Sequence, residues 1–113
     1  MSTKKVEFNG NTYNVTFNMA VEIKYEELSG QPFDLQHMDT QKATMQLCYA
    51  SMLIANSELP FTFDELKENV NVKEWIAMKQ TVIDAMTEWF EVPAVMQEEV
   101  PAEEENEGNQ PKN

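Results

Sequence analysis

Residues 47–55 impose the strongest constraint in this sequence, because they form an apolar run in which Ser51 is the main polar interruption. We expect a helix here that begins at Asp39 or Thr40 and ends at Asn56, with about 17 residues spanning ~25 Å. A helix that is apolar nearly all round is normally buried on several sides. The sequence therefore predicts a central helix around which a single small domain packs.

Two strands are predicted at residues 6–8 and 12–17, which alternate in polarity and are rich in β-branched and aromatic side chains. Residues 9–11, Asn-Gly-Asn, indicate a tight hairpin turn between them, since Asn and Gly tolerate positive φ. A lone hairpin is marginal in water, so one of its faces must pack on other elements. We expect that face to carry Phe8, Tyr13, Val15 and Phe17.

Three further helices are predicted from capping patterns and apolar spacing. Residues 19–29 form the first, with Asn18 as its N-cap and Gly30 as its end. Residues 62–70 form a short helix that opens with Thr-Phe-Asp-Glu, the pattern of a capping box. The last helix, residues 71–90, has large apolar side chains in two rows of seven-residue spacing, which indicate a wide apolar stripe. The rows are Trp75, Val82 and Trp89, and Ile76, Ile83 and Phe90, with Met86 between them.

The fold class expected from these elements is mainly α (α+β), with an N-terminal β-hairpin packed on a bundle of about four helices. Residues 1–90 would form this body. Residues 91–113 contain seven acidic residues and one basic residue, and the stretch from residue 97 onward has almost no apolar side chains. Such a segment cannot bury enough surface to offset its ordering entropy, so we expect an acidic disordered tail. It either serves solubility alone or recruits a basic partner.

The charge balance argues against several classes of partner. The chain has 113 residues and a net charge of −12, and all eight of its basic residues are lysines. Phosphate backbones and anionic membrane surfaces would repel it, and no arginine is present to fork onto a phosphate or a guanine. No leader-like or membrane-spanning apolar segment is seen, so we expect a cytoplasmic location and no contact with nucleic acid or membrane.

The residues that could carry chemistry are few. His37 is the only histidine and Cys48 the only cysteine, so no familiar zinc-ligand spacing exists. Cys48 lies in the most apolar stretch, where a buried structural thiol is expected rather than a nucleophile. The paired carboxylates Glu26-Glu27 and Asp64-Glu65 are interpreted as a solvated helix face and a helix start. We therefore expect no catalytic residues, no metal, no cofactor and no enzymatic activity.

A resemblance to a known family rests on the order of four segments. These are residues 6–13, the Val-Thr-Phe-Asn-Met of 15–19, the Ile-Lys-Tyr-Glu-Glu-Leu-Ser-Gly-Gln-Pro-Phe of 23–33, and the Leu-Cys-Tyr-Ala-Ser-Met-Leu of 47–53. In this order the chain resembles the tail assembly chaperones of long-tailed bacteriophages and prophages. The similarity covers about residues 5–56 and extends more loosely to residue 90.

The resemblance implies a role in which no residue is catalytic. Proteins of this family coat the long, aggregation-prone tape measure protein in the infected bacterial cell until tail tube subunits polymerise around it. In many phages a programmed frameshift adds a second domain that recruits the tail tube protein. The chain would then bind and solubilise the tape measure protein, with the tail tube protein as a further partner.

The partner-binding surface is predicted on the last helix, since flexible thioethers and large aromatic rings suit an adaptable contact. The same side chains could instead form the core or a seam between copies of the chain, and periodicity alone does not separate these. The alternative function is a small acidic adaptor or inhibitor protein that binds a basic partner. The residues predicted to contact a partner are Trp75, Ile76, Met86, Trp89 and Phe90.

Overall fold

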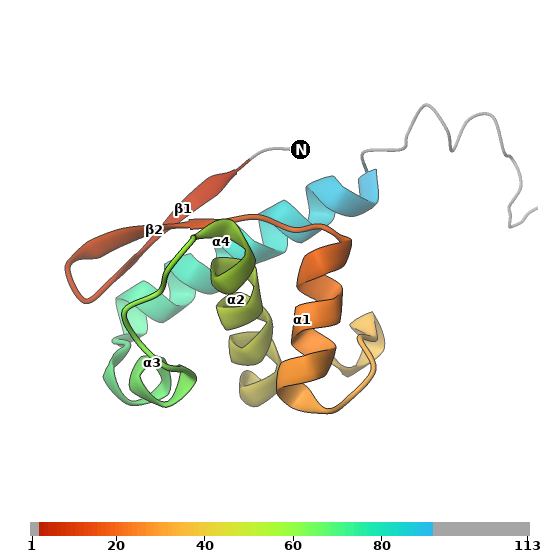
Figure 1. Ribbon diagram of the computed structural model, residues 1–113, viewed down its shortest axis with the longest axis horizontal. Coiled ribbons are helices and arrows are strands. Elements are labelled where there is room, and N and C mark those ends of the chain that lie inside the picture. The colour runs from red at the N-terminus through yellow and green to blue at the C-terminus, as the bar shows by residue number, and fades with distance from the viewer. Residues whose placement is uncertain (1–2, 92–113) are drawn as a thin grey trace, which may run out of the picture.

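A computed structural model describes residues 3–91 of the chain. Two antiparallel strands, β1 (Lys4–Phe8) and β2 (Asn11–Val15), precede four α-helices and one short 3-10 helix (Figure 1). This architecture confirms the predicted fold class of a hairpin followed by four helices. The helical elements are α1 (Met19–Ser29), η1 (Leu35–His37), α2 (Gln41–Ala55), α3 (Phe63–Asn69) and α4 (Val72–Glu91).

The acidic tail predicted from residue 91 onward falls almost wholly outside the described residues. Glu91 itself is the last residue of α4, so the helix extends one residue past the predicted boundary of the body. A shift of one or two residues at a helix end is within the range over which terminal turns fray.

The hairpin turns where the sequence predicts, with Asn9 at φ 55° and Gly10 at φ 84°. These left-handed conformations are the ones that a two-residue hairpin requires. The strands pair in a register that sets Val6 opposite Tyr13 and Phe8 opposite Asn11. One face is buried, as expected, although Tyr13 is only half-buried. The buried side chains on this face of the hairpin are Val6, Phe8, Val15 and, just past the end of β2, Phe17.

Local hydrogen bonds explain where the helices begin and end. The Asn18 side chain accepts from the Val21 N–H to start α1, and Gly30 closes that helix at φ 72°. Thr40 caps α2 in the same way. Thr62 and Glu65 form the predicted capping box at the start of α3, each side chain accepting from the other's backbone N–H.

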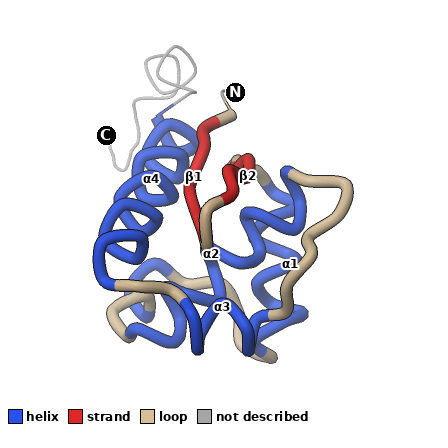
Figure 2. The backbone as a smooth tube through the Cα atoms, turned by 90° about the vertical axis from the view of Figure 1, so that its left-hand side faces the viewer, coloured by secondary structure: helices blue, strands red, loops and turns tan. Residues whose placement is uncertain are grey.

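Helix α2 is the central element, as the apolar run predicts. It packs against α1, α3, α4 and strand β2, while β1 lies beside α4 (Figure 2). Every residue from Leu47 to Met52 is buried, including the hydroxyl-bearing Ser51. Burial on several sides is what an all-round apolar helix needs. The core is completed by Val21, Tyr25, Phe61, Leu66, Met78, Val82 and Ala85.

Ser51 in α2 and Asn56, the C-cap of α2, form hydrogen bonds with backbone groups on the outer edge of the hairpin, in β2 and just past its end. The Asn56 amide accepts from the Asn14 N–H at 3.1 Å and donates to the Asn14 carbonyl at 2.8 Å. Ser51 Oγ likewise accepts from the Thr16 N–H at 3.2 Å and donates to the Thr16 carbonyl. The backbone groups that face away from β1 are therefore paired at both residues.

Candidate functional site

Helix α4 presents two rows of large apolar side chains, and the structure separates them. The row of Trp75, Val82 and Trp89 faces the core, with Val82 buried and both tryptophans half-buried against it. The row of Ile76, Ile83 and Phe90 faces outward, with 58%, 40% and 41% of these side chains exposed. The two rows are one residue apart, which is about 100° around a helix. The predicted stripe is thus divided into a buried part and an exposed part.

Both tryptophans have polar partners that fix their orientation. Trp75 Nε1 donates to Gln41 Oε1 at 3.1 Å, which ties α4 to the start of α2. Trp89 Nε1 donates to Glu22 Oε2 at 3.0 Å, which ties the end of α4 to α1. An indole N–H that is drawn into a core needs such a partner. These two predicted contact residues therefore hold the helices together.

The outward row continues the length of α4. Val72, at the first turn, is 74% exposed and lies at the spacing that extends the row through Ile76. Phe90, at the far end, rests on the core through a ring contact with Phe17, 6.1 Å between centroids. We call the exposed side chains Val72, Ile76, Ile83 and Phe90 the α4 strip.

A shallow groove of about 420 Å³ lies beside the α4 strip, between α4, η1 and the start of α2. Met86 and Ile83 line it from α4, and Leu35, which is 49% exposed, lines it from η1. Lys79 supplies its one basic side chain and Asp39 its one acidic side chain. The remaining lining residues are Met38, Thr40, Gln41, Thr44 and Leu47.

Of the five residues predicted to contact a partner, Ile76 and Phe90 lie on the α4 strip and Met86 lies in the groove. Trp75 and Trp89 face the core. The prediction omitted Val72, Ile83 and Leu35, which the structure leaves exposed. Ile83 lies midway between Ile76 and Phe90 in the same row of seven-residue spacing. Treating this row separately from the tryptophan row would therefore have predicted Ile83 as a contact residue.

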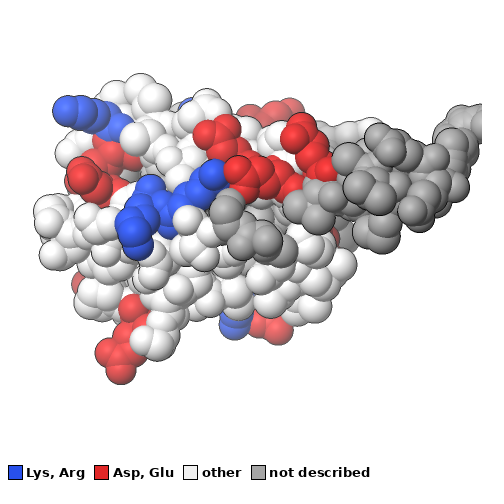
Figure 3. All heavy atoms as spheres, turned by 90° about the horizontal axis from the view of Figure 1, so that it is seen from above, with Lys and Arg blue, Asp and Glu red and all other residues white. Residues whose placement is uncertain are grey.

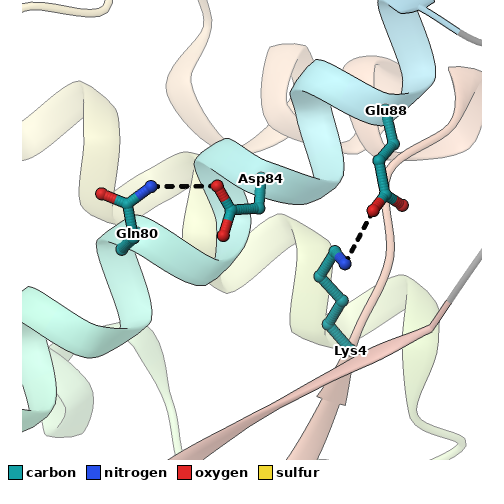
Figure 4. Close-up of polar contacts among 4 residues, drawn as sticks. All are labelled: Lys4, Gln80, Asp84 and Glu88. Carbon is teal, nitrogen blue, oxygen red and sulfur yellow. Dashed lines mark hydrogen bonds and ion pairs between the residues drawn. The ribbon is translucent and has the colours of Figure 1, made fainter.

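The outer face of α4, next to the α4 strip, is polar. Gln80 Nε2 donates to Asp84 Oδ1 at 2.9 Å, one helical turn apart (Figure 4). Glu88 forms an ion pair with Lys4 of β1 at 2.8 Å, which links this face to the hairpin. Figure 3 shows lysine side chains adjoining acidic ones on the face of the molecule seen from above. The α4 strip thus runs between a charged face and the groove.

The groups with potential chemistry are placed as follows. The Cys48 thiol is buried in α2, and desolvation raises its pKa to about 12 although Lys79 opposes the shift. His37 ends η1. Among residues 3–91, no cluster of three or more His, Cys, Asp or Glu side chains could hold a metal ion. Within the same part of the chain, none of the helices has the length and apolar character needed to span a membrane.

This part of the surface consists of an apolar strip, an adjoining groove and a lysine at one end of the groove. Contact surfaces of this kind bury apolar side chains at their centre and leave charges at the rim. Comparison of the chain with protein-family models, with curated proteins and with solved structures found no match.

Proposed function

We propose that this protein is a stoichiometric binding protein of the phage tail assembly chaperone type, which keeps the tape measure protein soluble in the bacterial cytoplasm during tail assembly. The observation that carries the proposal is the α4 strip, four apolar side chains left exposed along one helix beside a groove. The family assignment comes from the resemblance of residues 5–56. Stoichiometric binding agrees with a surface whose centre is apolar.

A helical segment of the client suits this surface. An amphipathic helix places its apolar anchors at i, i+3, i+4 and i+7, and a groove that runs along a helix receives such a row. The exposed strip and the groove would bury the anchors, with Met86 as an adaptable wall. The tape measure protein is long and aggregation-prone, so it offers many apolar segments of this kind in succession.

The net charge of −12 supports the proposal that the protein keeps its client soluble. Copies of this chain arranged along one client would give the complex a large negative charge. Charge of one sign keeps such complexes apart and soluble. The outer face of α4, with Asp84 and Glu88, would stay in water while the α4 strip is covered.

Co-expression with the tape measure protein of the same phage or prophage tests the proposal. The strip variant carries Ile76→Ser and Ile83→Ser, and a matched control carries Gln80→Ala and Asp84→Ala on the adjoining polar face. We expect a tagged strip variant to retain about tenfold less tape measure protein, which corresponds to ~1.4 kcal/mol. The control variant should retain as much as the unchanged protein.

Equal retention by the strip variant and the control, with both folded by circular dichroism, would exclude the α4 strip as the client site. Measuring retention at increasing salt concentration distinguishes the chaperone from the alternative function, an acidic adaptor that binds a basic partner. Charge-based binding weakens steeply as ionic strength rises, whereas binding through apolar area survives. Retention that disappears at high salt and is indifferent to Ile76 and Ile83 would support the adaptor.

A further inference from the structure

We propose that Lys79 makes this surface selective for a partner helix that carries an acidic residue at the position facing Lys79, between apolar residues that cover the rest of α4. The inference rests on the proposed function and deepens it, because it states the chemistry that a client segment must have. Such a segment is an amphipathic helix with apolar residues in a coiled-coil spacing and one glutamate or aspartate among them.

The outward-facing residues of α4 follow a more regular spacing than the α4 strip alone shows. Lys79 and Met86 fill the two gaps in the strip, so that successive residues are separated alternately by four and three positions. This alternation is the spacing of a coiled-coil seam, in which each side chain inserts between side chains of a facing helix. We call this set the α4 seam, and it consists of Val72, Ile76, Lys79, Ile83, Met86 and Phe90.

One partner helix can lie along the whole of the α4 seam. The tryptophan row on one side of the seam packs against the core. The residues on its other side are polar and exposed, and they are Lys73, Gln80 and Thr87. From Val72 to Phe90 the seam is about 27 Å long at the helical rise per residue, which matches a partner helix of about three heptads. The groove beside α4, with Leu35 on its opposite wall, gives that helix a second contact.

Lys79 is the one charged residue of the α4 seam, and it lies between two exposed isoleucines, Ile76 and Ile83. Its ammonium lies over the Trp75 ring, 5.4 Å from the centroid, and it forms no ion pair with the residues that the structure describes. A helix that covers the seam takes this ammonium out of water, which is costly unless an opposite charge compensates. A partner with an apolar residue opposite Lys79 therefore loses affinity, whereas a carboxylate there pairs with the ammonium.

A single polar residue within an apolar seam also fixes the register of the two helices, at some cost in stability. Apolar residues at uniform spacing allow a partner helix to shift by one heptad, whereas an acid that must meet Lys79 allows one alignment. Asp39 lines the same groove and would repel the partner's carboxylate, so it confines that group to the Lys79 side. A long client would therefore bind through those segments in which an acid interrupts the apolar row.

A second copy of α4 does not supply this acid, because the six residues of the α4 seam include no Asp or Glu. A parallel copy would set Lys79 against Lys79 of the other copy, and like charges that face each other are unfavourable. An antiparallel copy that matches the two ends of the seam would set Lys79 against Ile83 and leave the ammonium unpaired. The surface therefore favours a helix of different sequence as its occupant.

Binding of two synthetic helical peptides to the full-length protein tests the inference. Both peptides have about 21 residues with leucine at the seam positions, except that the central one carries Glu in one peptide and Lys in the other. A central residue can meet Lys79 in either helix direction, because Lys79 is near the middle of the α4 seam. Fluorescence anisotropy of the labelled peptides measures the two dissociation constants. We expect the Glu peptide to bind about tenfold more tightly than the Lys peptide.

The overall charge of the protein acts in the opposite direction. A chain with a net charge of −12 attracts the more basic peptide, so overall charge does not explain a preference for the Glu peptide. Lys79→Glu should reverse the preference. The matched control is Lys73→Glu, which changes the net charge by the same amount on the polar side of α4 and should keep the preference. Lys79→Gln should abolish the preference, and it replaces Lys79→Glu if that variant does not fold.

Equal binding of the two peptides to the unchanged protein, tighter binding of the Lys peptide, or no binding of either would overturn the inference. A preference that Lys73→Glu abolishes as fully as Lys79→Glu would also overturn it, because the selectivity would then not reside in the seam. A dimer of the free protein that dissociates in the variant with Ile76→Ser and Ile83→Ser would overturn it in favour of a second copy as the occupant.

The peptide experiment and the co-expression experiment can fail separately. A preference for the Glu peptide without retention of the tape measure protein would refute that protein as the client, but not the selectivity of Lys79. Retention of the tape measure protein through the α4 strip, with no preference between the peptides, would refute the selectivity alone.

Discussion

Trp89 donates its indole N–H to Glu22 Oε2 at 3.0 Å, and this bond joins the last turns of α4 to the first turn of α1. We expect Trp89→Ala to lower the free energy of unfolding by about 2–3 kcal/mol, because the ring is half-buried against the core. Trp89→Phe keeps most of the ring and loses the N–H, so its cost should be about 1 kcal/mol. Urea denaturation gives both values, and a Trp89→Phe variant as stable as the unchanged protein would show that the hydrogen bond contributes nothing.

The α4 strip should be nearly neutral for stability, in contrast to Trp89. Ile76 and Ile83 are 58% and 40% exposed, so replacing either with Ser should lower the free energy of unfolding by less than about 1 kcal/mol. The midpoint of thermal unfolding measures this. A loss comparable to that of Trp89→Ala would mean that the strip is part of the core, and the binding proposal would lose its basis.

Ser51 is buried and bonds both backbone groups of Thr16. Ser51→Ala should destabilise the protein by about 1–3 kcal/mol, because the Thr16 N–H and carbonyl would be left unpaired in the core. Ser57→Ala is the matched control, since Ser57 is exposed and its loss should be close to neutral. Similar unfolding midpoints for the two variants would contradict the role assigned to Ser51.

Because the Cys48 thiol is buried, we expect the free energy of unfolding to decrease at alkaline pH. Burial raises the pKa of this thiol from 9.0 to about 12 in the folded protein. The unfolded chain therefore loses its proton first, and the free energy of unfolding should fall as pH rises from 9 to about 12, by up to about 1 kcal/mol per pH unit. Below pH 9 this contribution should be constant. Denaturation at a series of pH values measures the slope.

Cys48→Ala supplies the control for that slope. Tyr49 also has its pKa raised, by burial and by Glu65, so part of the alkaline loss should remain in the variant. The difference between the two slopes belongs to Cys48. Identical slopes would show that the thiol is accessible enough to ionise in the folded protein.

The elements could be predicted from the sequence because their boundaries are set by local interactions. Asn18 and Gly30 bracket α1, and Thr62 with Glu65 opens α3, through bonds that span only a few residues. Strand β1 is longer than predicted, beginning at Lys4, because pairing with β2 extends it through residues of low strand propensity. That extension depends on the partner strand, which local reasoning does not include.

The orientation of α4 could not be predicted, because both of its rows are apolar and have the same spacing. Contacts distant in sequence decide between them: Gln41 fixes Trp75 and Glu22 fixes Trp89. Only the tertiary arrangement shows that the Ile76 row remains exposed, and thus which part of the stripe a partner can reach.

The bonds from Asn56 and Ser51 to strand β2 limit how this protein can recognise anything. Partners of many proteins attach by adding a strand to an open sheet edge, and aggregating chains use the same route. Here Asn14 and Thr16 already have their outward backbone groups occupied, and β1 lies against α4 on the other side. An extended chain therefore cannot pair with the backbone of Asn14 or Thr16 without displacing these side chains. The Asn56 and Ser51 side chains thus take the place of a neighbouring strand along this part of the hairpin, where an unpaired edge would otherwise favour aggregation.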